Sequence, residues 1–214
     1  MSDQLSGETF SSLNSVSSPT VFVVFGSQGS GKSTQVNRLA DRLKLTVFEA
    51  GQVLRERAKL DGKLDRQINQ GVLVANVTME GIVDNFVDEH RNINGYILDG
   101  YPRNISQFND LITLSGKHNW RVAGIFVNIS DMAAKLRLST RFQLVNGQRL
   151  ARKDDKPEIV QRRLNTFRKE TLPLKDKFKQ RFELMEIDGE PSVDDVTAQI
   201  DLAVNRFLNV RNKN

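Results

Sequence analysis

One stretch near the N-terminus limits the fold of this chain more than any other. Val21–Phe25 is a β-branched and aromatic run without polar alternation, which is typical of a strand buried on both faces. It leads directly into Gly26–Ser33, the phosphate loop, which fits the pattern G-x-x-x-x-G-K-[ST] at every fixed position. Apolar residues at helical spacing follow it: Val36, Leu39, Ala40 and Leu43. This order predicts a loop whose backbone N–H groups hold a phosphate at a helix N-terminus.

The rest of the chain alternates between short apolar runs and amphipathic stretches. Further buried strands are predicted at 46–48, 96–98, 122–129 and 182–187. Helices are predicted at about 51–60, 75–90, 105–118, 131–140, 157–168 and 193–209. Strands that alternate with helices require crossover connections. We therefore predict an α/β fold of the P-loop NTPase type, with three layers and a five-stranded parallel sheet flanked by helices.

The composition excludes several kinds of chemistry. The chain has no cysteine, so it can form neither a disulfide nor a cysteine zinc site, and it has no thiol nucleophile. Its two histidines are too few for a histidine metal cluster. No apolar run approaches the ~20 residues of a membrane span, so we expect a soluble, cytoplasmic protein. Residues 1–20 contain seven serines and no Lys or Arg, which predicts a disordered tail and not a signal peptide.

Positive charge is concentrated in one part of the chain. Residues 135–181 hold 15 of the 31 Lys and Arg residues but only five of the 26 Asp and Glu residues. Such a block indicates an anionic partner, either a nucleic acid or a polyphosphate ligand. Aromatic residues make up only 7% of the chain, so few side chains could stack on bases. The polyphosphate is therefore favoured, and no nucleic acid is expected.

Polar residues near the predicted strand ends fit phosphoryl transfer. Asp99 follows a buried strand and is a candidate for holding magnesium, usually through water, with Ser33 of the phosphate loop as its partner. Five arginines lie in segments that flank this edge: Arg103, Arg137, Arg141, Arg152 and Arg163. Phosphoryl transfer needs positive charge around the moving group and alignment of donor and acceptor. One lysine, one magnesium site and several arginines meet that need.

Together these motifs resemble those of adenylate kinases and related nucleoside monophosphate kinases, from Val21 to about Phe207. The segments that carry the resemblance are the phosphate loop, Ala50–Arg55, Gly71–Val74, Asp99–Arg103 with Gln107, the arginine pairs and Asp188-Gly189. The resemblance implies reversible, direct in-line phosphoryl transfer from Mg-ATP to AMP, giving two ADP.

The resemblance also assigns roles to residues. It implies an ATP site formed by Gly29, Ser30, Gly31, Lys32, Ser33, Thr34, Arg137, Arg141 and Pro191. It implies an AMP site formed by Ala50, Gly51, Arg55, Val72, Val74, Gly100, Arg103, Gln107, Arg152 and Arg163. The implied catalytic residues are Lys32, Arg103, Arg137, Arg141, Arg152 and Arg163.

By the same resemblance, residues 21–210 form a single kinase domain with two small inserts. The insert that binds the monophosphate spans about 49–78, and the lid spans about 141–152. Only ten residues separate Arg141 from Arg152, which is similar to the short-lid form without a zinc knuckle. The family habit and the chain length favour a monomer.

The chain departs from the family pattern at several positions, which leaves alternatives open. Gln28 stands where proline is usual, and Ser33 where glycine is usual. Ala50 resembles the UMP/CMP kinases, whereas Gln107 matches the glutamine that reads adenine in adenylate kinases. AMP is the favoured acceptor and UMP or CMP the alternative. Gln28, Ala50 and Gln52 also leave open an inactive relative that binds nucleotide without turnover.

Overall fold

The computed structural model describes residues 18–59, 62, 76–92, 94–140, 142–145, 148–151 and 156–210, with backbone alone at 76–78, 142–145 and 148–151. A five-stranded parallel sheet with the strand order β2-β3-β1-β4-β7 forms its centre. The strands are β1 (Thr20–Phe25), β2 (Thr46–Glu49), β3 (Gly95–Asp99), β4 (Arg121–Asn128) and β7 (Glu183–Asp188). All five strands predicted from the sequence are present, so the predicted fold class is confirmed.

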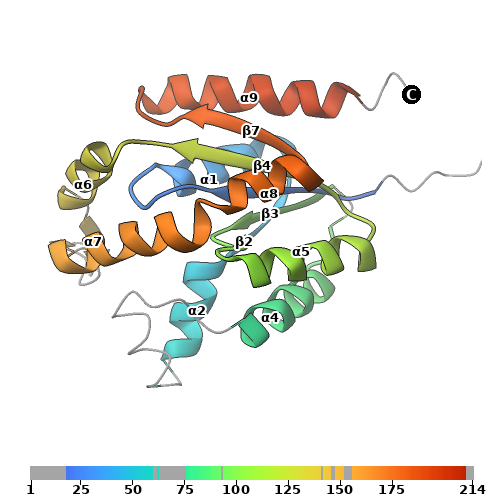
Figure 1. Ribbon diagram of the computed structural model, residues 1–214, viewed down its shortest axis with the longest axis horizontal. Helices are drawn as coiled ribbons and strands as arrows, with labels where there is room; N and C mark the ends of the chain where they lie inside the picture. Colours follow the sequence, from blue (N-terminus) through green and yellow to red (C-terminus); the bar gives the residue numbers. More distant parts are fainter. Residues whose placement is uncertain are drawn as a thin grey trace, which may run out of the picture.

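Helices cover both faces of this sheet, as Figure 1 shows. The helix α1 (Lys32–Leu43) and the helix α9 (Val193–Asn209) pack on one face. On the other face lie α4 (Asn76–Glu89), α5 (Ile105–Lys117) and α8 (Leu174–Arg181). Three further helices are α2 (Ala50–Ala58), α6 (Asp131–Ser139) and α7 (Pro157–Thr166). In Figure 1 they lie toward the end of the molecule where β4 and β7 point.

The central strand β1 explains why the sheet needs both layers. Its side chains alternate between the two faces, so Val21, Val23 and Phe25 join the core under α4, α5 and α8. Phe22 and Val24 join the core under α1 and α9. All of these side chains are buried. A strand buried on both faces shows a continuous apolar run, as the sequence does.

Three helices begin where a polar side chain accepts a hydrogen bond from one of their first N–H groups. Asn104 caps α5, Ser130 caps α6 and Ser192 caps α9, each through a side-chain oxygen. The helix α1 differs, because its N-cap is Gly31 and its first turn carries no acidic side chain. The positive N-terminal end of α1 is therefore not neutralised by its own sequence.

Four elements differ from the sequence prediction. The helix predicted at 157–168 continues as a π-helix, η2 (Phe167–Thr171), and then as α8. The helix α8 contains few apolar residues, and among them Leu174 and Phe178 are buried. So few apolar positions give only a weak periodic signal in the sequence. In the predicted lid, β5 (Phe142–Val145) and β6 (Gln148–Ala151) pair antiparallel as a separate sheet. Four-residue strands of this kind carry too little pattern to be recognised from sequence.

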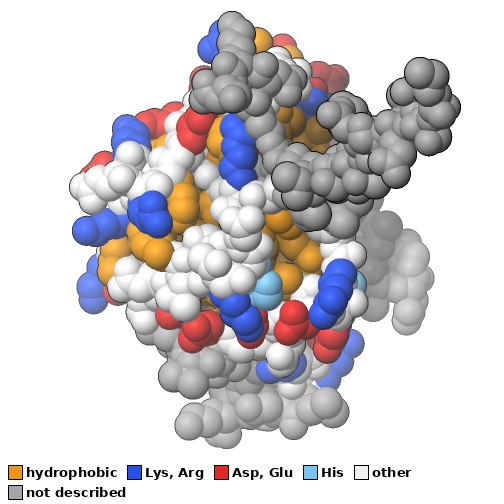
Figure 2. Space-filling model, turned by 90° about the vertical axis from the view of Figure 1, so that its right-hand side faces the viewer, with side chains coloured by type: hydrophobic (Ala, Val, Ile, Leu, Met, Phe, Trp, Pro, Cys, Tyr) orange, Lys and Arg blue, Asp and Glu red, His pale blue; other side chains and the backbone are white. Residues whose placement is uncertain are grey.

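The surface at the opposite end of the molecule, where the strands begin, has mixed charge. Figure 2 shows acidic and basic side chains near one another on the described part of this face. None of the helices formed by the described residues is long and apolar enough to cross a bilayer.

Candidate active site

A pocket of about 430 Å³ opens at the carboxyl ends of the parallel strands. Residues that end or follow β1, β2 and β3 line it, together with residues of α2, α6, α7 and η2. Parallel sheets place their ligand sites at this edge, because the connecting loops meet there. Among the predicted site residues, the following line the pocket: Gly29, Gly31, Lys32, Ser33, Thr34, Ala50, Gly51, Arg55, Asp99, Gly100, Arg103, Gln107, Arg137 and Arg163.

Two glycines fix the path of the phosphate loop between β1 and α1. Gly26 has a φ of 151°, and a Cβ there would lie 2.2 Å from the carbonyl oxygen of Val127. Gly29 has a φ of 80°, and a Cβ there would lie 2.9 Å from the carbonyl oxygen of Ala134. The loop is thus packed against β4 and α6 at two points where no side chain fits. This packing holds the loop around the N-terminus of α1, as anion binding requires.

The ammonium of Lys32 is held at the loop itself. Its Nζ donates to the carbonyl oxygens of Gly26 at 2.9 Å and Ser27 at 2.7 Å. It also lies 3.4 Å from the hydroxyl of Ser30, which is buried beneath the loop and does not line the pocket. These three acceptors are neutral, so they position the ammonium at the loop without adding a negative charge beside it.

Asp99 is the last residue of β3. The strand was predicted to end one residue earlier, with Asp99 directly after it. Its Oδ2 accepts a hydrogen bond from the Ser33 hydroxyl at 3.2 Å. Burial raises the pKa of Asp99, whereas the charges of Lys32 and Arg103 lower this pKa by smaller amounts. Glu49, its register partner on β2, raises the pKa further. A buried carboxylate beside a hydroxyl supplies two oxygen ligands of the kind that magnesium prefers.

The raised pKa of Asp99 predicts a pH-dependent gain in stability for Asp99→Asn. The folded protein binds this proton more tightly than the unfolded chain, so stability from this group is lost as pH rises through the folded pKa. Without nucleotide and magnesium, the variant should have a higher melting temperature than the wild type at pH 7. The rise should be about 3 °C for each kcal/mol of free energy that burying the charged carboxylate costs the wild type. The difference should shrink as pH falls toward the ordinary aspartate pKa. Melting curves from pH 4 to 8 measure it, and a pH-independent difference would contradict the assignment.

Two arginines fold back over glycines in this pocket. The Nε of Arg103 donates to the carbonyl oxygen of Gly100 at 2.8 Å, and a Cβ at Gly100 would lie 2.7 Å from Nη2 of Arg103. The guanidinium of Arg55 lies over Gly51 and pairs with Glu49 at 3.2 Å. Burial lowers the pKa of Arg103; Asp99 opposes this shift, and the charges of Arg163 and Arg55 add to it. The cationic groups therefore lie close enough to repel one another, and a bound anion would relieve this repulsion.

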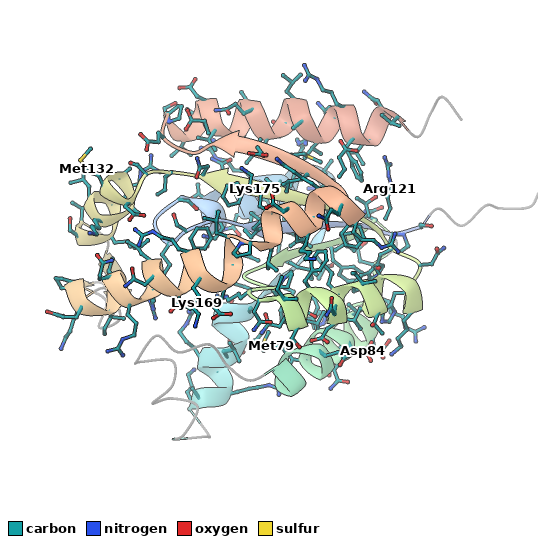
Figure 3. The ribbon with its side chains drawn as sticks, viewed as in Figure 1. Met79, Asp84, Arg121, Met132, Lys169 and Lys175 are labelled. Atoms are coloured by element: carbon teal, nitrogen blue, oxygen red, sulfur yellow. The ribbon has the colours of Figure 1, made fainter. Side chains whose placement is uncertain are left out.

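Gln107 and Ala50 lie at the apolar part of the pocket. Gln107 is buried on the first turn of α5, and its Oε1 accepts from the backbone N–H of Arg103 at 2.8 Å. Ala50 is buried at the start of α2. Apolar side chains near them include Leu54 and Met79, which comes from α4 (Figure 3). The pocket thus combines cationic groups with an apolar region that carries one amide.

Arg137 and Arg163 reach the pocket from α6 and α7. Arg137 donates to the carbonyl oxygens of Gly189 at 2.9 Å and Glu190 at 3.0 Å, in the turn after β7. Pro191 follows this turn, is exposed, and does not line the pocket. The Nη1 of Arg163 donates to Oε1 of Gln28 at 3.3 Å. These contacts join α6 to the last strand and α7 to the phosphate loop.

Some site residues lie outside the described part of the chain, and others were missed by the sequence analysis. Val72, Val74, Arg141 and Arg152 lie outside the described residues. Glu49, Met79, Phe167 and Thr171 line the pocket but were not predicted. Glu49 could have been found as the residue that follows the strand predicted at 46–48. Thr171, which donates to the carbonyl oxygen of Arg103 at 2.7 Å, belongs to the π-helix and carries no local signal.

Comparison with known proteins shows the family to which this chain belongs. The family model described as adenylate kinase matches residues 24–183. The adenylate kinase of Azobacteroides pseudotrichonymphae is 34% identical over 183 residues, which are 83% of this chain and 93% of that protein. That of Bartonella henselae is 33% identical over 186 residues, 83% of this chain and 96% of that protein. That of Chelativorans is 31% identical over 186 residues, 84% of this chain and 95% of that protein. The family predicted from the motifs is confirmed, and the chain belongs to the adenylate kinase family of phosphotransferase enzymes.

Proposed function

We propose that this enzyme transfers the γ-phosphoryl group of Mg-ATP directly to AMP, reversibly, to give two ADP. The observation that carries the proposal is that one pocket contains both the phosphate loop and the separate arginine pair Arg55 and Arg103. A phosphoryl transfer between two nucleotides needs two phosphate sites that face each other. The family membership supports the same reaction.

The donor nucleotide is assigned to the phosphate loop. We propose that the N–H groups at the start of α1 and the ammonium of Lys32 hold the ATP phosphates, because this N-terminus carries no acidic side chain. Pro191 belongs to the adenine end, after the turn that Arg137 contacts. The full proposed set is Gly29, Ser30, Gly31, Lys32, Ser33, Thr34, Arg137, Arg141 and Pro191.

The acceptor nucleotide is assigned to the arginines and the apolar region. We propose that Arg55 and Arg103 hold its phosphate and that Gln107 hydrogen-bonds its base, because all three line one pocket. The remaining members of the proposed set are Ala50, Gly51, Val72, Val74, Gly100, Arg152 and Arg163. Two segments would close on the nucleotides: about 49–78, which contains α2, and about 141–152, which contains β5 and β6.

Magnesium fits the oxygen ligands beside the loop. The Ser33 hydroxyl and the buried carboxylate of Asp99 lie within hydrogen-bonding distance, so we propose that they hold the ion that accompanies ATP, Asp99 through water. When bound, the ion neutralises charge on the phosphates. The chain itself supplies alignment and positive charge. As charge spreads over the oxygens of the transferring group, this group is stabilised by Lys32, Arg103, Arg163, Arg137, Arg141 and Arg152.

The acceptor is tested by measuring ADP formation from Mg-ATP with AMP, UMP, CMP and GMP offered separately. We expect AMP to be preferred by about tenfold or more in kcat/KM, because an amide can pair with the edge of adenine. Gln107→Asn should reduce this preference, whereas Ala50→Thr should leave AMP preferred.

The same assay separates the alternatives. A preference for UMP or CMP would show that the space left by Ala50 decides the acceptor, since that residue is buried in the same pocket. No turnover with any acceptor but retained binding of ATP would show an inactive relative.

A further inference from the structure

A pair of side chains, Gln28 and Arg163, joins the phosphate loop to the helix α7, and the glutamine of this pair is not part of the family pattern. Gln28 belongs to the loop, Arg163 belongs to α7, and the two residues are 135 positions apart in the sequence. The Oε1 of Gln28 accepts from Nη1 of Arg163 at 3.3 Å, and both residues line the pocket. Gln28 is one of the positions where this chain departs from the family.

Both partners are carried by well-packed backbone. Gln28 lies between Gly26 and Gly29, the two glycines whose positions are fixed by contact with β4 and α6. Arg163 precedes Leu164, which is buried with Val160 in a cluster that joins α7 to α6. Because both backbone segments are packed in this way, the contact constrains the direction of the Arg163 guanidinium.

The chemistry of the acceptor atom matters as much as its position. The charge of Arg163 is among those that lower the pKa of Arg103, so two cations face the same space. An amide oxygen can orient a guanidinium without removing its charge. Arg55 shows the opposite arrangement, because its partner Glu49 is a carboxylate that a phosphate must displace. Arg163 is therefore oriented by a neutral acceptor, which leaves its positive charge in place.

We propose that Gln28 is a positioning residue for the reaction: its side-chain oxygen holds Arg163 over the phosphate loop, aimed at the phosphoryl group in transfer. The inference rests on the proposed function and adds a residue that the motif assignments do not contain. Gln28 acts through Arg163, so its contribution belongs to the transition state more than to the binding of ATP.

Steady-state kinetics and a double-mutant cycle test this. Gln28→Ala should lower kcat about fivefold and leave the KM for ATP within about twofold, because alignment is lost but the ATP contacts remain. In an Arg163→Ala background the same substitution should have no further effect. Gln28→Glu should instead raise the KM for ATP about tenfold, because a carboxylate neutralises Arg163 and repels the phosphates. Gln161→Ala is the matched control, since this α7 side chain contacts Asn165 outside the pocket.

A readout without turnover keeps the inference separate from the proposed function. In the nucleotide-free protein, Gln28→Ala should shift or broaden the side-chain NMR signal of Arg163, while melting temperatures stay equal. An unchanged Arg163 signal, or equal losses of kcat in the wild-type and Arg163→Ala backgrounds, would overturn the role of Gln28. If the wild-type protein showed no turnover with any acceptor, that result would contradict the proposed reaction. The NMR comparison would still decide whether Gln28 positions Arg163.

Discussion

Replacing Lys32 with alanine is expected to lower kcat by about a thousandfold or more while the protein stays folded. The ammonium lies at the inner side of the phosphate loop, where neutral oxygens of Gly26, Ser27 and Ser30 hold it. Its positive charge is the one that the loop presents to the transferring phosphates. Water cannot replace a fixed charge in the pocket, so the loss falls on the transition state.

The fold should tolerate this change, because the loop has other supports. Gly26 and Gly29 pack against backbone of β4 and α6, and Lys32 belongs to none of the three hydrophobic clusters formed by the described residues. We expect the free energy of unfolding to fall by at most about 2 kcal/mol, the value of hydrogen bonds to a charged donor. Lys135→Ala is the matched control, since that lysine is exposed on α6 and does not line the pocket. Near wild-type turnover by the Lys32 variant would reject its assigned role, and a melted protein would reject the structural argument.

Replacing Arg103 with methionine is expected to have opposite effects on activity and stability. The value of kcat/KM for the acceptor should fall by about a thousandfold, because the guanidinium is the proposed ligand of the acceptor phosphate. The melting temperature should stay the same or rise. Burial lowers the pKa of Arg103, and the charges of Arg163 and Arg55 lower it further, so the empty pocket holds this cation at a cost. Methionine retains most of the side-chain volume and removes the charge.

Two comparisons make this prediction specific. Binding of Mg-ATP alone, measured by calorimetry, should be almost unchanged, because the phosphate loop remains intact. Arg103→Lys should recover only part of the activity, since an ammonium cannot form the planar, two-pronged contact of a guanidinium. Arg91→Met, at an exposed site after α4, controls for loss of surface charge. A large fall in melting temperature would show that Arg103 stabilises the empty fold.

The sequence predicted those parts of the fold that depend on neighbouring residues. The apolar run of β1, the glycines after it and the helical spacing of α1 are all local, and the structure confirms each of them. Asp99 was placed correctly at the end of a buried strand for the same reason. The predicted helices mostly end within one or two residues of the observed ends. Local patterns suffice here because burial on two faces leaves a continuous apolar signal.

The tertiary structure alone decided which side chains meet. The strand order puts β1 between β3 and β4, so the phosphate loop lies beside Asp99 and is packed against Val127 and α6. The π-helix brings Thr171 to the carbonyl of Arg103, and α7 brings Arg163 to Gln28. Each contact joins residues more than 60 positions apart. Residue type and spacing determined the phosphate loop and its helix, because these are set by local conformation. The hydrogen-bonding partners of Arg137 and Arg163 were decided only when the layers packed.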